Sequence, residues 1–420
     1  MGFAGIYLQK QTDFNVKITE NPHPELRFIV VIPCFNEPDI LVTLESVRNS
    51  KQTKEPLEVI VVINSASSTD KEIIGQNRKT YIEVKNWIEN KSDSSLSFYV
   101  LLEENLSDKF AGAGLARKIG MDQAIYRFDS LNNPNGVIIS LDADSVIKPD
   151  YFVEIEQHFE KYPKANALTS YFEHPLQGEE FDAQVYHAIS IYELYLRYYK
   201  TALKYSGFPY AFHTVGSCFA VTAKAYVKQG GMNRKQAGED FYFLHKIFPL
   251  GECYELNSSC VYPSPRISER VPFGTGPMVK NIIDSDGYFL SYDFRPFLDL
   301  KYFFKQLDYF YKIDMMELND LLYQMPLPVV DFLSDNDFHA ALEEINNNCS
   351  GIKTFRKRFF NWFNAFMVLK FLNVTAEKFY PKTELLDEAE KLLKALNLNI
   401  TVERDYKNYL LLFRQLEKGF

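Results

Sequence analysis

The chain has 420 residues, 46% of them hydrophobic and 24% charged, so we expect a folded protein of two domains rather than a disordered one. Its formal net charge of -9 argues against a nucleic-acid-binding protein, because phosphate recognition there is dominated by Lys and Arg. Five cysteines without a Cys-X-X-Cys pair argue against a disulfide framework or a zinc site and are typical of a cytoplasmic protein.

Short apolar runs alternate with amphipathic stretches from about residue 27 to residue 257, which predicts an α/β domain. The β-branched run from Phe28 to Pro33 predicts a buried parallel strand, and a helix is expected to open near Pro38. The same patterns predict strands at 57–63, 96–102 and 136–141, and helices at about 71–89, 113–128 and 149–162, the last with Pro149 in its first turn.

Three polar clusters follow predicted strand ends: Asn36-Glu37, Asn64-Ser65 and Asp142-Ala-Asp144. In doubly wound sheets, ligands bind beyond the carboxyl ends of the strands, so we expect one site at this edge. The two carboxylates of Asp142 and Asp144 could both reach a hard divalent cation such as Mg2+ or Mn2+. The alternative is a solvated turn, in which Asp is common.

Strand patterns fade after about Asp293, which predicts an α/β domain over 1–290 and a mainly helical region over 291–420. Within that region, the stretch from Lys353 to Phe363 combines basic and aromatic residues. It is either a helix lying on anionic lipid or a core helix with a charged first turn. The first 17 residues lack the pattern of a signal peptide, so we expect a cytoplasmic protein, with contact at the inner face of the membrane left open.

Five short motifs follow one another over about residues 27 to 280: Phe28-Ile-Val-Val-Ile-Pro-Cys-Phe-Asn-Glu37, Ser68-Thr-Asp70, Gly112-Ala-Gly-Leu-Ala-Arg117, Leu141-Asp-Ala-Asp-Ser145 and Gly238-Glu-Asp240. Their order and spacing resemble those of a family 2 glycosyltransferase. This resemblance implies a GT-A fold, a nucleotide-diphospho-sugar donor, a divalent metal and inversion at the anomeric carbon.

The resemblance also assigns roles to individual residues. Asp142 would face the ribose or donor sugar, and Asp144 would bind the metal, with Asp142 beside it. Asp240 would be the general base that takes the proton of the acceptor hydroxyl, with Glu239 orienting the acceptor. The alternative for this acidic pair is favourable placement at a helix N-terminus. The remaining residues expected around the nucleotide are Pro33, Asn36, Glu37 and Arg117, the last with a surface salt bridge as its alternative.

Two departures from the family pattern concern the base and the metal. Asn64-Ser65 stands where many relatives carry an Asp that reads the base, although the Asn64 amide can still hydrogen-bond to one. Residues 263–266 contain no His as a third metal ligand, so the metal would rely on Asp144, phosphates and water. Arg266 and Arg270, beside Gly274-Thr-Gly276, could form a lid on the diphosphate or an ordinary interdomain loop.

The tyrosine-rich helix expected from Phe181 to Tyr205 would lie beside the acceptor, but core packing explains most of its tyrosines equally well. His187 and His213 are interpreted as structural. The motifs together with the resemblance imply a metal-dependent inverting transferase acting on a glycan, glycolipid or small hydroxyl acceptor, in surface polysaccharide or glycolipid synthesis. One alternative is a retaining enzyme acting on a small acceptor such as glycerate, and another is a non-catalytic scaffold that binds sugar nucleotides. A third is a nucleotidyltransferase, but that class usually has a glycine-rich loop after the first strand, which Cys34-Phe-Asn-Glu37 lacks.

Overall fold

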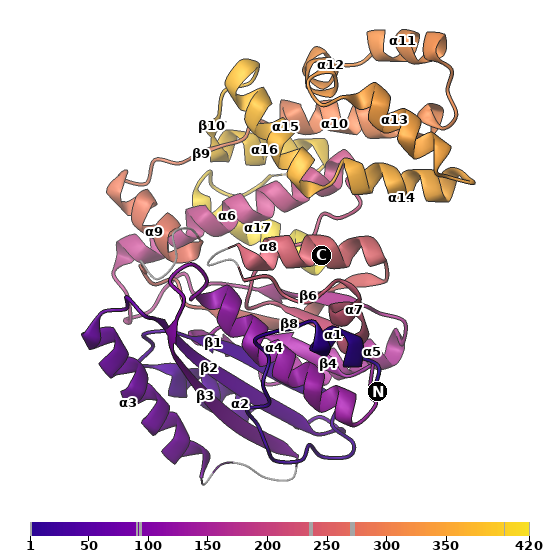
Figure 1. Ribbon diagram of the computed structural model, residues 1–420. Coiled ribbons are helices and arrows are strands. Elements are labelled where there is room, and N and C mark those ends of the chain that lie inside the picture. The colour runs from indigo at the N-terminus through magenta and orange to yellow at the C-terminus, as the bar shows by residue number, and fades with distance from the viewer. Residues whose placement is uncertain are drawn as a thin grey trace. The chain divides into compact units, whose positions relative to one another are not determined.

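The computed structural model describes residues 2–89, 91, 95–234, 238–268, 274–398 and 400–419 (Figure 1). The chain divides into two compact units. Unit 1 comprises Met1–Ile189 and Thr214–Asn281, and unit 2 comprises Ser190–His213 and Ile282–Phe420. Unit 2 therefore takes a segment from the middle of the chain in addition to the C-terminal residues.

Unit 1 contains an eight-stranded sheet with the order β3-β2-β1-β4-β7-β6-β8-β5. Its parallel part confirms the four predicted strands: β1 (Phe28–Cys34), β2 (Leu57–Ala66), β3 (Leu96–Leu106) and β4 (Val137–Ser140). Every residue of β1 is buried, as expected of a central strand with helices on both faces. The second part, whose strands had not been singled out in the sequence, consists of β5 (Ser145–Ile147), β6 (Ala167–Phe172), β7 (Phe219–Thr222) and β8 (Cys253–Pro263).

The helices of unit 1 follow the predicted alternation closely. Asp70 caps α3 as expected, because its carboxylate accepts a hydrogen bond from the backbone N–H of Glu72. The expected place of Pro149 was wrong, since α5 begins only at Tyr151, after the N-cap residue Asp150. The bounds are α1 (Gly5–Gln9), α2 (Ile40–Arg48), α3 (Lys71–Ile88), α4 (Ala113–Ser130), α5 (Tyr151–Lys161), α7 (Ala223–Lys228), α8 (Glu239–Ile247) and η1 (Phe248–Leu250).

Helix α4 lies against β1 and β2 and is also in contact with α1 and α7, so its residues are buried on several sides (Figure 1). A Cβ atom added to Gly120 would lie 2.5 Å from the Val31 side chain, which explains the glycine at this helix–sheet contact. The close approach fixes the position of α4 relative to the strand ends, where its first turns carry Arg117.

Unit 2 is mainly helical, as expected, apart from the two-residue strands β9 (Leu290–Ser291) and β10 (Thr383–Glu384). The core is rich in phenylalanine, with Phe303 packing against the rings of Phe359 and Phe363. The helical elements are α10 (Arg295–Lys305), η2 (Leu307–Phe310), α11 (Met315–Tyr323), α12 (Leu327–Ser334), α13 (Phe338–Asn347), α14 (Ile352–Trp362), α15 (Ala365–Lys378), α16 (Leu385–Ala395) and α17 (Tyr406–Lys418). Helices α6 (Ala183–Ser206) and α9 (Thr275–Asp284) contain residues of both units.

The basic aromatic stretch forms α14, whose apolar side chains Phe355 and Phe359 are fully buried. Its basic side chains are exposed, and Arg356 pairs with Asp308. The apolar face of α14 thus packs into the core of unit 2, in agreement with its interpretation as a core helix. Among the described residues, no helix is long and apolar enough to cross a membrane.

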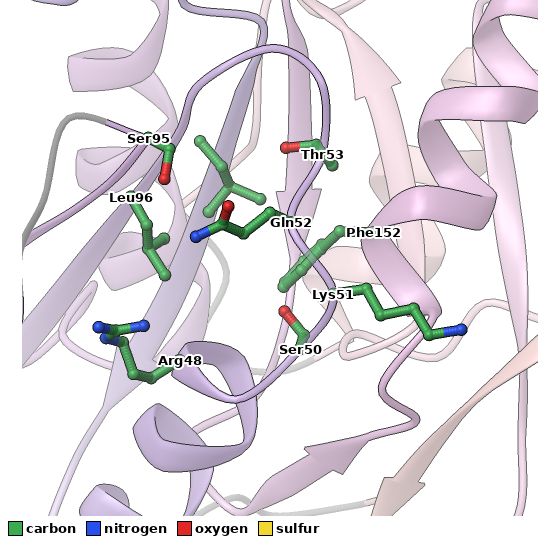
Figure 2. A pocket seen from close by; sticks show the side chains of 9 residues that line it. Arg48, Ser50, Lys51, Gln52, Thr53, Ser95, Leu96 and Phe152 are labelled. Atoms are coloured by element: carbon green, nitrogen blue, oxygen red, sulfur yellow. The ribbon is translucent and has the colours of Figure 1, made fainter.

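A small cavity of about 80 Å³ lies where β2 and β3 begin, and Arg48, Gln52 and Phe152 are among its lining residues (Figure 2). Leu57 and Leu96, the first residues of the two strands, also line it. The amino ends of the strands are the opposite edge of the sheet from the predicted site, so this cavity is not the candidate active site.

Candidate active site

The ends of β1, β2 and β4 meet at one edge of the sheet, as predicted. Cys34 at the end of β1 pairs with Ile63, and Val31 pairs with Ser140 at the end of β4. The backbone N–H of Asn36 donates to Oδ1 of Asn77 at 2.8 Å, and the Asn77 amide donates in turn to the carbonyl of Asn64. Asn77 on α3 therefore joins the first two polar clusters, a role that the sequence gave no signal for.

The third cluster is tied to α2 by Thr43, whose hydroxyl donates to the carbonyl of Ala143 at 2.8 Å. This bond fixes the backbone between Asp142 and Asp144. Both carboxylates are about one-third exposed, so they can be reached by a ligand. Thr43 was another residue that sequence reasoning missed, because its apolar neighbours in α2 gave it the appearance of an ordinary core position.

Two expected nucleotide contacts are largely buried in the protein. Pro33 pairs within the sheet with Val62. Asn64 is 1% exposed, and its amide nitrogen donates to the carbonyl of Gly112, the residue before α4, at 2.9 Å. Asn64 thus positions the start of α4 in this structure.

Arg117 is buried, with 5% of its side chain exposed, so the surface salt bridge considered for it is wrong. Its guanidinium donates to the carboxylates of Asp142 and Glu239, and its Nε donates to the hydroxyl of Ser140 at 3.2 Å. A Cβ atom at Gly216 would lie 2.4 Å from Arg117 Nη2, so the absence of a side chain there leaves room for the guanidinium. Arg117 joins the Asp142 loop to the start of α8.

Asp240 lies in the first turn of α8, which Gly238 enters in the left-handed conformation with a φ of 67°. Its Oδ1 accepts a hydrogen bond from the backbone N–H of Phe241 at 2.7 Å. Burial and the charge of Glu239 raise the pKa of Asp240 to about 7, although Arg117 acts in the opposite direction. A carboxylate with this pKa can accept a proton at neutral pH, which is what a general base requires.

Arg266 connects Asp144 to Glu37. Its Nη2 donates to Asp144 Oδ2 at 2.7 Å and also to Glu37, whose other oxygen accepts from Nη1 at 3.0 Å. The antiparallel pairing of Ser145 with Pro263 brings the residue after Asp144 next to the end of β8, and hence Arg266 close to Asp144. The second arginine of the predicted lid, Arg270, lies outside the described residues.

The site carries an excess of negative charge. Glu37, Asp142, Asp144, Glu239 and Asp240 contribute five carboxyl groups, which are accompanied by the guanidinium groups of Arg117 and Arg266. With all five ionised, the formal excess is three negative charges. A diphosphate entering this site would be repelled unless further positive charge came with it.

The donor atoms fit a divalent cation that is shared with a substrate. Among the described residues, no three His, Cys, Asp or Glu side chains gather into a group that could hold a metal ion by themselves. Asp142 and Asp144, however, present oxygen atoms at a partly exposed turn in a negatively charged site. Mg2+ commonly takes one or two carboxylates and completes its coordination with substrate phosphates and water.

The predicted aromatic and histidine residues near the acceptor have structural contacts. Tyr195 packs against Phe289 and Tyr199 against Tyr292, all within unit 2. His213 lies 2.9 Å from a carboxylate oxygen of Glu417 in the same unit. Core packing therefore accounts for these two tyrosines and for His213.

The mixed α/β sheet of unit 1 with its flanking helices is a GT-A type fold. Residues 29–229 match the family model described as Glycosyl transferase family 2. This part of the chain, which includes Asp142 and Asp144, is similar to family 2 glycosyltransferases, and the protein is a glycosyltransferase. Asp240 lies beyond the matched residues.

No curated protein matches the chain in sequence. Among solved structures, S. aureus TarS 1-349 in complex with UDP-GlcNAc has 16% identity and a TM-score of 0.40, with 73% of this chain and 84% of that chain covered. The mannosyltransferase PcManGT from Pyrobaculum calidifontis, in complex with GDP-Man and Mn2+, has 14% identity and a TM-score of 0.37, with 89% and 94% covered. Both likenesses are too weak to bear on the substrate or the metal of this protein.

Proposed function

We propose that this glycosyltransferase is metal-dependent and inverting, and that it moves a sugar from a nucleoside diphosphate to an acceptor hydroxyl. The observation that carries this proposal is the position of Arg117 between Asp142 and Glu239. One buried guanidinium thereby joins the loop that would receive the donor to the helix turn that carries Asp240. The two halves of a displacement reaction need this kind of fixed relation.

On the donor side, Asn36 and Glu37 would lie around the nucleoside, with Pro33 and Asn64 beneath them. Asp142 and Asp144 would hold Mn2+ or Mg2+ with their carboxylate oxygens. The cation, when bound, would neutralise the charge that develops on the departing diphosphate. Arg266, and Arg270 with it, would donate to the phosphate oxygens, which a guanidinium fits well because its donors form a planar fork.

On the acceptor side, Asp240 would take the proton of the attacking hydroxyl as its oxygen bonds to the anomeric carbon and the diphosphate leaves. Glu239, held by Arg117, would fix the turn that presents Asp240 and would orient the acceptor. A base that deprotonates the acceptor during attack fits a single displacement, which inverts the anomeric carbon. A retaining enzyme acting on a small acceptor is the rival, and the anomeric configuration of the product, measured by NMR, separates the two.

A non-catalytic scaffold that binds sugar nucleotides would need no base. The raised pKa of Asp240, which lies near the turn bearing Asp142, favours a catalytic role over a scaffold role. The donor sugar, an acceptor on a glycan or glycolipid, and contact with a membrane stay predictions. Because Phe355 and Phe359 are buried, any contact of α14 with lipid would use its exposed basic residues.

The proposal is tested by a thermal-shift series with UDP-, GDP-, ADP- and dTDP-sugars, each with and without Mn2+. A ligand present at about 100 times its Kd stabilises the native state by roughly 2.7 kcal/mol, which is readily seen in the Tm. We expect one nucleotide to raise the Tm only when Mn2+ is present, and Asp144→Asn to abolish this shift. The matched control is Asp308→Asn, which removes an exposed carboxylate paired with Arg356 in unit 2.

A shift that is independent of Mn2+, or one that survives in Asp144→Asn, would contradict the metal role of Asp144. Binding of a sugar nucleotide without any turnover over a panel of acceptors would favour the scaffold.

A further inference from the structure

Arg266 already neutralises the carboxylate that the proposed metal needs. Its Nη2 is 2.7 Å from Asp144 Oδ2, and the same nitrogen also donates to Glu37. A guanidinium at this place repels a cation and uses one of the oxygen atoms that would coordinate it. The arrangement is therefore suited to a site from which free metal is excluded.

The two bonds of Arg266 differ in how easily they can be given up. Glu37 is 1% exposed and uses both oxygens to accept from Arg266. Asp144 is 30% exposed, and the printed contact with Arg266 runs from Nη2 to Oδ2. Leaving a buried carboxylate without its partner is costly, whereas a partly exposed pair exchanges with water at little cost. Arg266 can thus leave Asp144 while it stays attached to Glu37.

We propose that Arg266 is a latch on the donor site, which makes metal binding depend on the nucleotide. Without nucleotide, its guanidinium pairs with Asp144 and keeps free divalent cations away. When a nucleoside diphosphate enters, its phosphate oxygens compete for the guanidinium, Arg266 turns about Glu37 to meet them, and the Asp144 carboxylate becomes available. The inference rests on the proposed function, because it takes the donor to be a nucleoside diphosphate that shares its metal with Asp144.

The latch explains an otherwise awkward combination of residues. The turn bearing Asp142 and Asp144 is strongly acidic in its surroundings and partly exposed, and such a turn would by itself attract divalent cations. A metal bound before the donor could hold the site in an unproductive state. With Arg266 in place, donor and metal bind together. The Arg266 guanidinium then leaves Asp144 and donates to the diphosphate instead.

The test measures Mn2+ binding by the electron paramagnetic resonance signal of free Mn2+, first without nucleotide and then with UDP or GDP, each alone. The variants are Arg266→Met, which removes the charge but keeps the length of the side chain, and Glu37→Gln, which weakens the attachment of Arg266. The control is Arg356→Met, which breaks an exposed pair of the same kind, with Asp308. Circular dichroism and the Tm establish that each variant is folded.

Without nucleotide, we expect Arg266→Met to bind Mn2+ about tenfold more tightly than the wild type, as the loss of one charged hydrogen bond implies. Glu37→Gln keeps the Arg266 cation beside Asp144 and removes a negative charge, so it should show no gain, and neither should Arg356→Met. With nucleotide, the wild type should recover most of its Mn2+ affinity, whereas Arg266→Met should gain little further.

If wild type and Arg266→Met bind Mn2+ equally tightly without nucleotide, the latch is wrong. If both nevertheless bind Mn2+ when the nucleotide is present, the proposed metal role of Asp144 is still supported. If Arg266→Met does not fold, the same comparison between wild type and Arg266→Gln decides. Absence of Mn2+ binding in every variant, with either nucleotide, would overturn the latch and the metal dependence together.

Discussion

Each unit contains a cluster in which arginine and carboxylate side chains meet. In unit 2, the carboxylate of Glu193 accepts from Arg197 and from Arg414, with distances of 2.7 to 2.9 Å. Glu417 accepts from Arg197 and lies within reach of Lys200 and His213. In unit 2, two carboxylates are thus accompanied by three cations, those of Arg197, Lys200 and Arg414. In unit 1, five carboxyl groups are accompanied by only two guanidinium groups.

The comparison separates a structural cluster from one that is prepared for a ligand. The carboxylates in unit 2 are at most 5% exposed, and each contacts several donors, so nothing needs to be added. In unit 1, Asp142 and Asp144 are about one-third exposed, and the negative charge is only partly compensated. Buried arginines and short contacts alone would have marked both clusters as candidate sites, whereas charge balance and exposure distinguish them.

The largest effect should come from Asp240→Asn, which replaces the proposed base by an amide of the same shape. Because general base catalysis contributes about 10² to 10⁴-fold, we expect kcat to fall about 10³-fold. The Tm should stay unchanged or rise, since burial of this carboxylate raises its pKa and makes its ionised form unfavourable. Steady-state kinetics and calorimetry on the same preparation check both expectations, and an unchanged kcat would remove Asp240 from the mechanism.

The same acid-to-amide change in unit 2, Glu193→Gln, should have the opposite outcome. It leaves Arg197 and Arg414 buried with a neutral partner, and breaking a buried ion pair costs about 3 to 5 kcal/mol. We expect a lower Tm with kcat unchanged at temperatures where the variant is folded. As a control, Asp308→Asn at an exposed pair should cost less than about 1 kcal/mol. A loss of kcat in a folded Glu193→Gln would show that the unit 2 cluster does more than hold α6 to α17.

The parallel half of the sheet was predictable from sequence because its strands are short β-branched runs followed by amphipathic helices. The register of β1 with β2 and β4 then brought Asn36, Asn64 and Asp142 to one edge, as expected from the general rule for such sheets. The second half was not singled out, because β5 has three residues and the burial of β8 does not alternate. The segment from Ser190 to His213 was likewise not expected to join the C-terminal helices.

Within the site, the sequence did not predict which side chains the candidate residues contact. Arg117 was expected near the nucleotide, but its bonds to Asp142 and Glu239 depend on residues 25 and 122 positions away. Asn77 was missed because a polar residue in an amphipathic helix usually faces solvent, and Thr43 was missed because its apolar neighbours gave it the appearance of a core position. Such contacts depend on the closing of the tertiary fold, for which a single sequence contains no local pattern.

A third change, Gly216→Ala, should disturb the unit 1 cluster without removing a charge from it. The new Cβ atom would lie 2.4 Å from Nη2 and 2.9 Å from Cζ of Arg117, whose three partners prevent it from moving away freely. We expect kcat/KM to fall about tenfold, equivalent to roughly 1.4 kcal/mol of lost transition-state stabilisation. Gly75→Ala on α3 is the matched control, because its Cβ would meet nothing within 4 Å. Equal kinetics in the two variants would mean that the position of Arg117 is not critical.

The response to pH is the prediction that sharpens the comparison most. Since the pKa of Asp240 is raised to about 7, kcat/KM should rise with pH up to about 7 and level off above it. The folded-state pKa lies above the unfolded value of 3.8, so the contribution of Asp240 to stability is present below about pH 4 and is lost as the pH rises through about 7.

Glu417 should behave in the opposite way. Burial alone would raise its pKa, but His213, Arg197 and Lys200 outweigh burial and hold the pKa below its usual range. Its contribution to stability is therefore complete above the ordinary glutamate pKa of 4.5 and is lost only as the pH falls below that value.

Between pH 5 and pH 8, the cluster in unit 1 should gain a negative charge while Glu417 in unit 2 stays ionised. The measurement is kcat/KM and Tm over this pH range, for the wild type and for Asp240→Asn, which should lose the pH dependence. The result distinguishes a cluster that exchanges protons during catalysis from one that only stabilises the fold. A flat kcat/KM profile from pH 5 to pH 8 in the wild type would mean that the two clusters are alike in this respect, and that the acceptor proton is taken by another group.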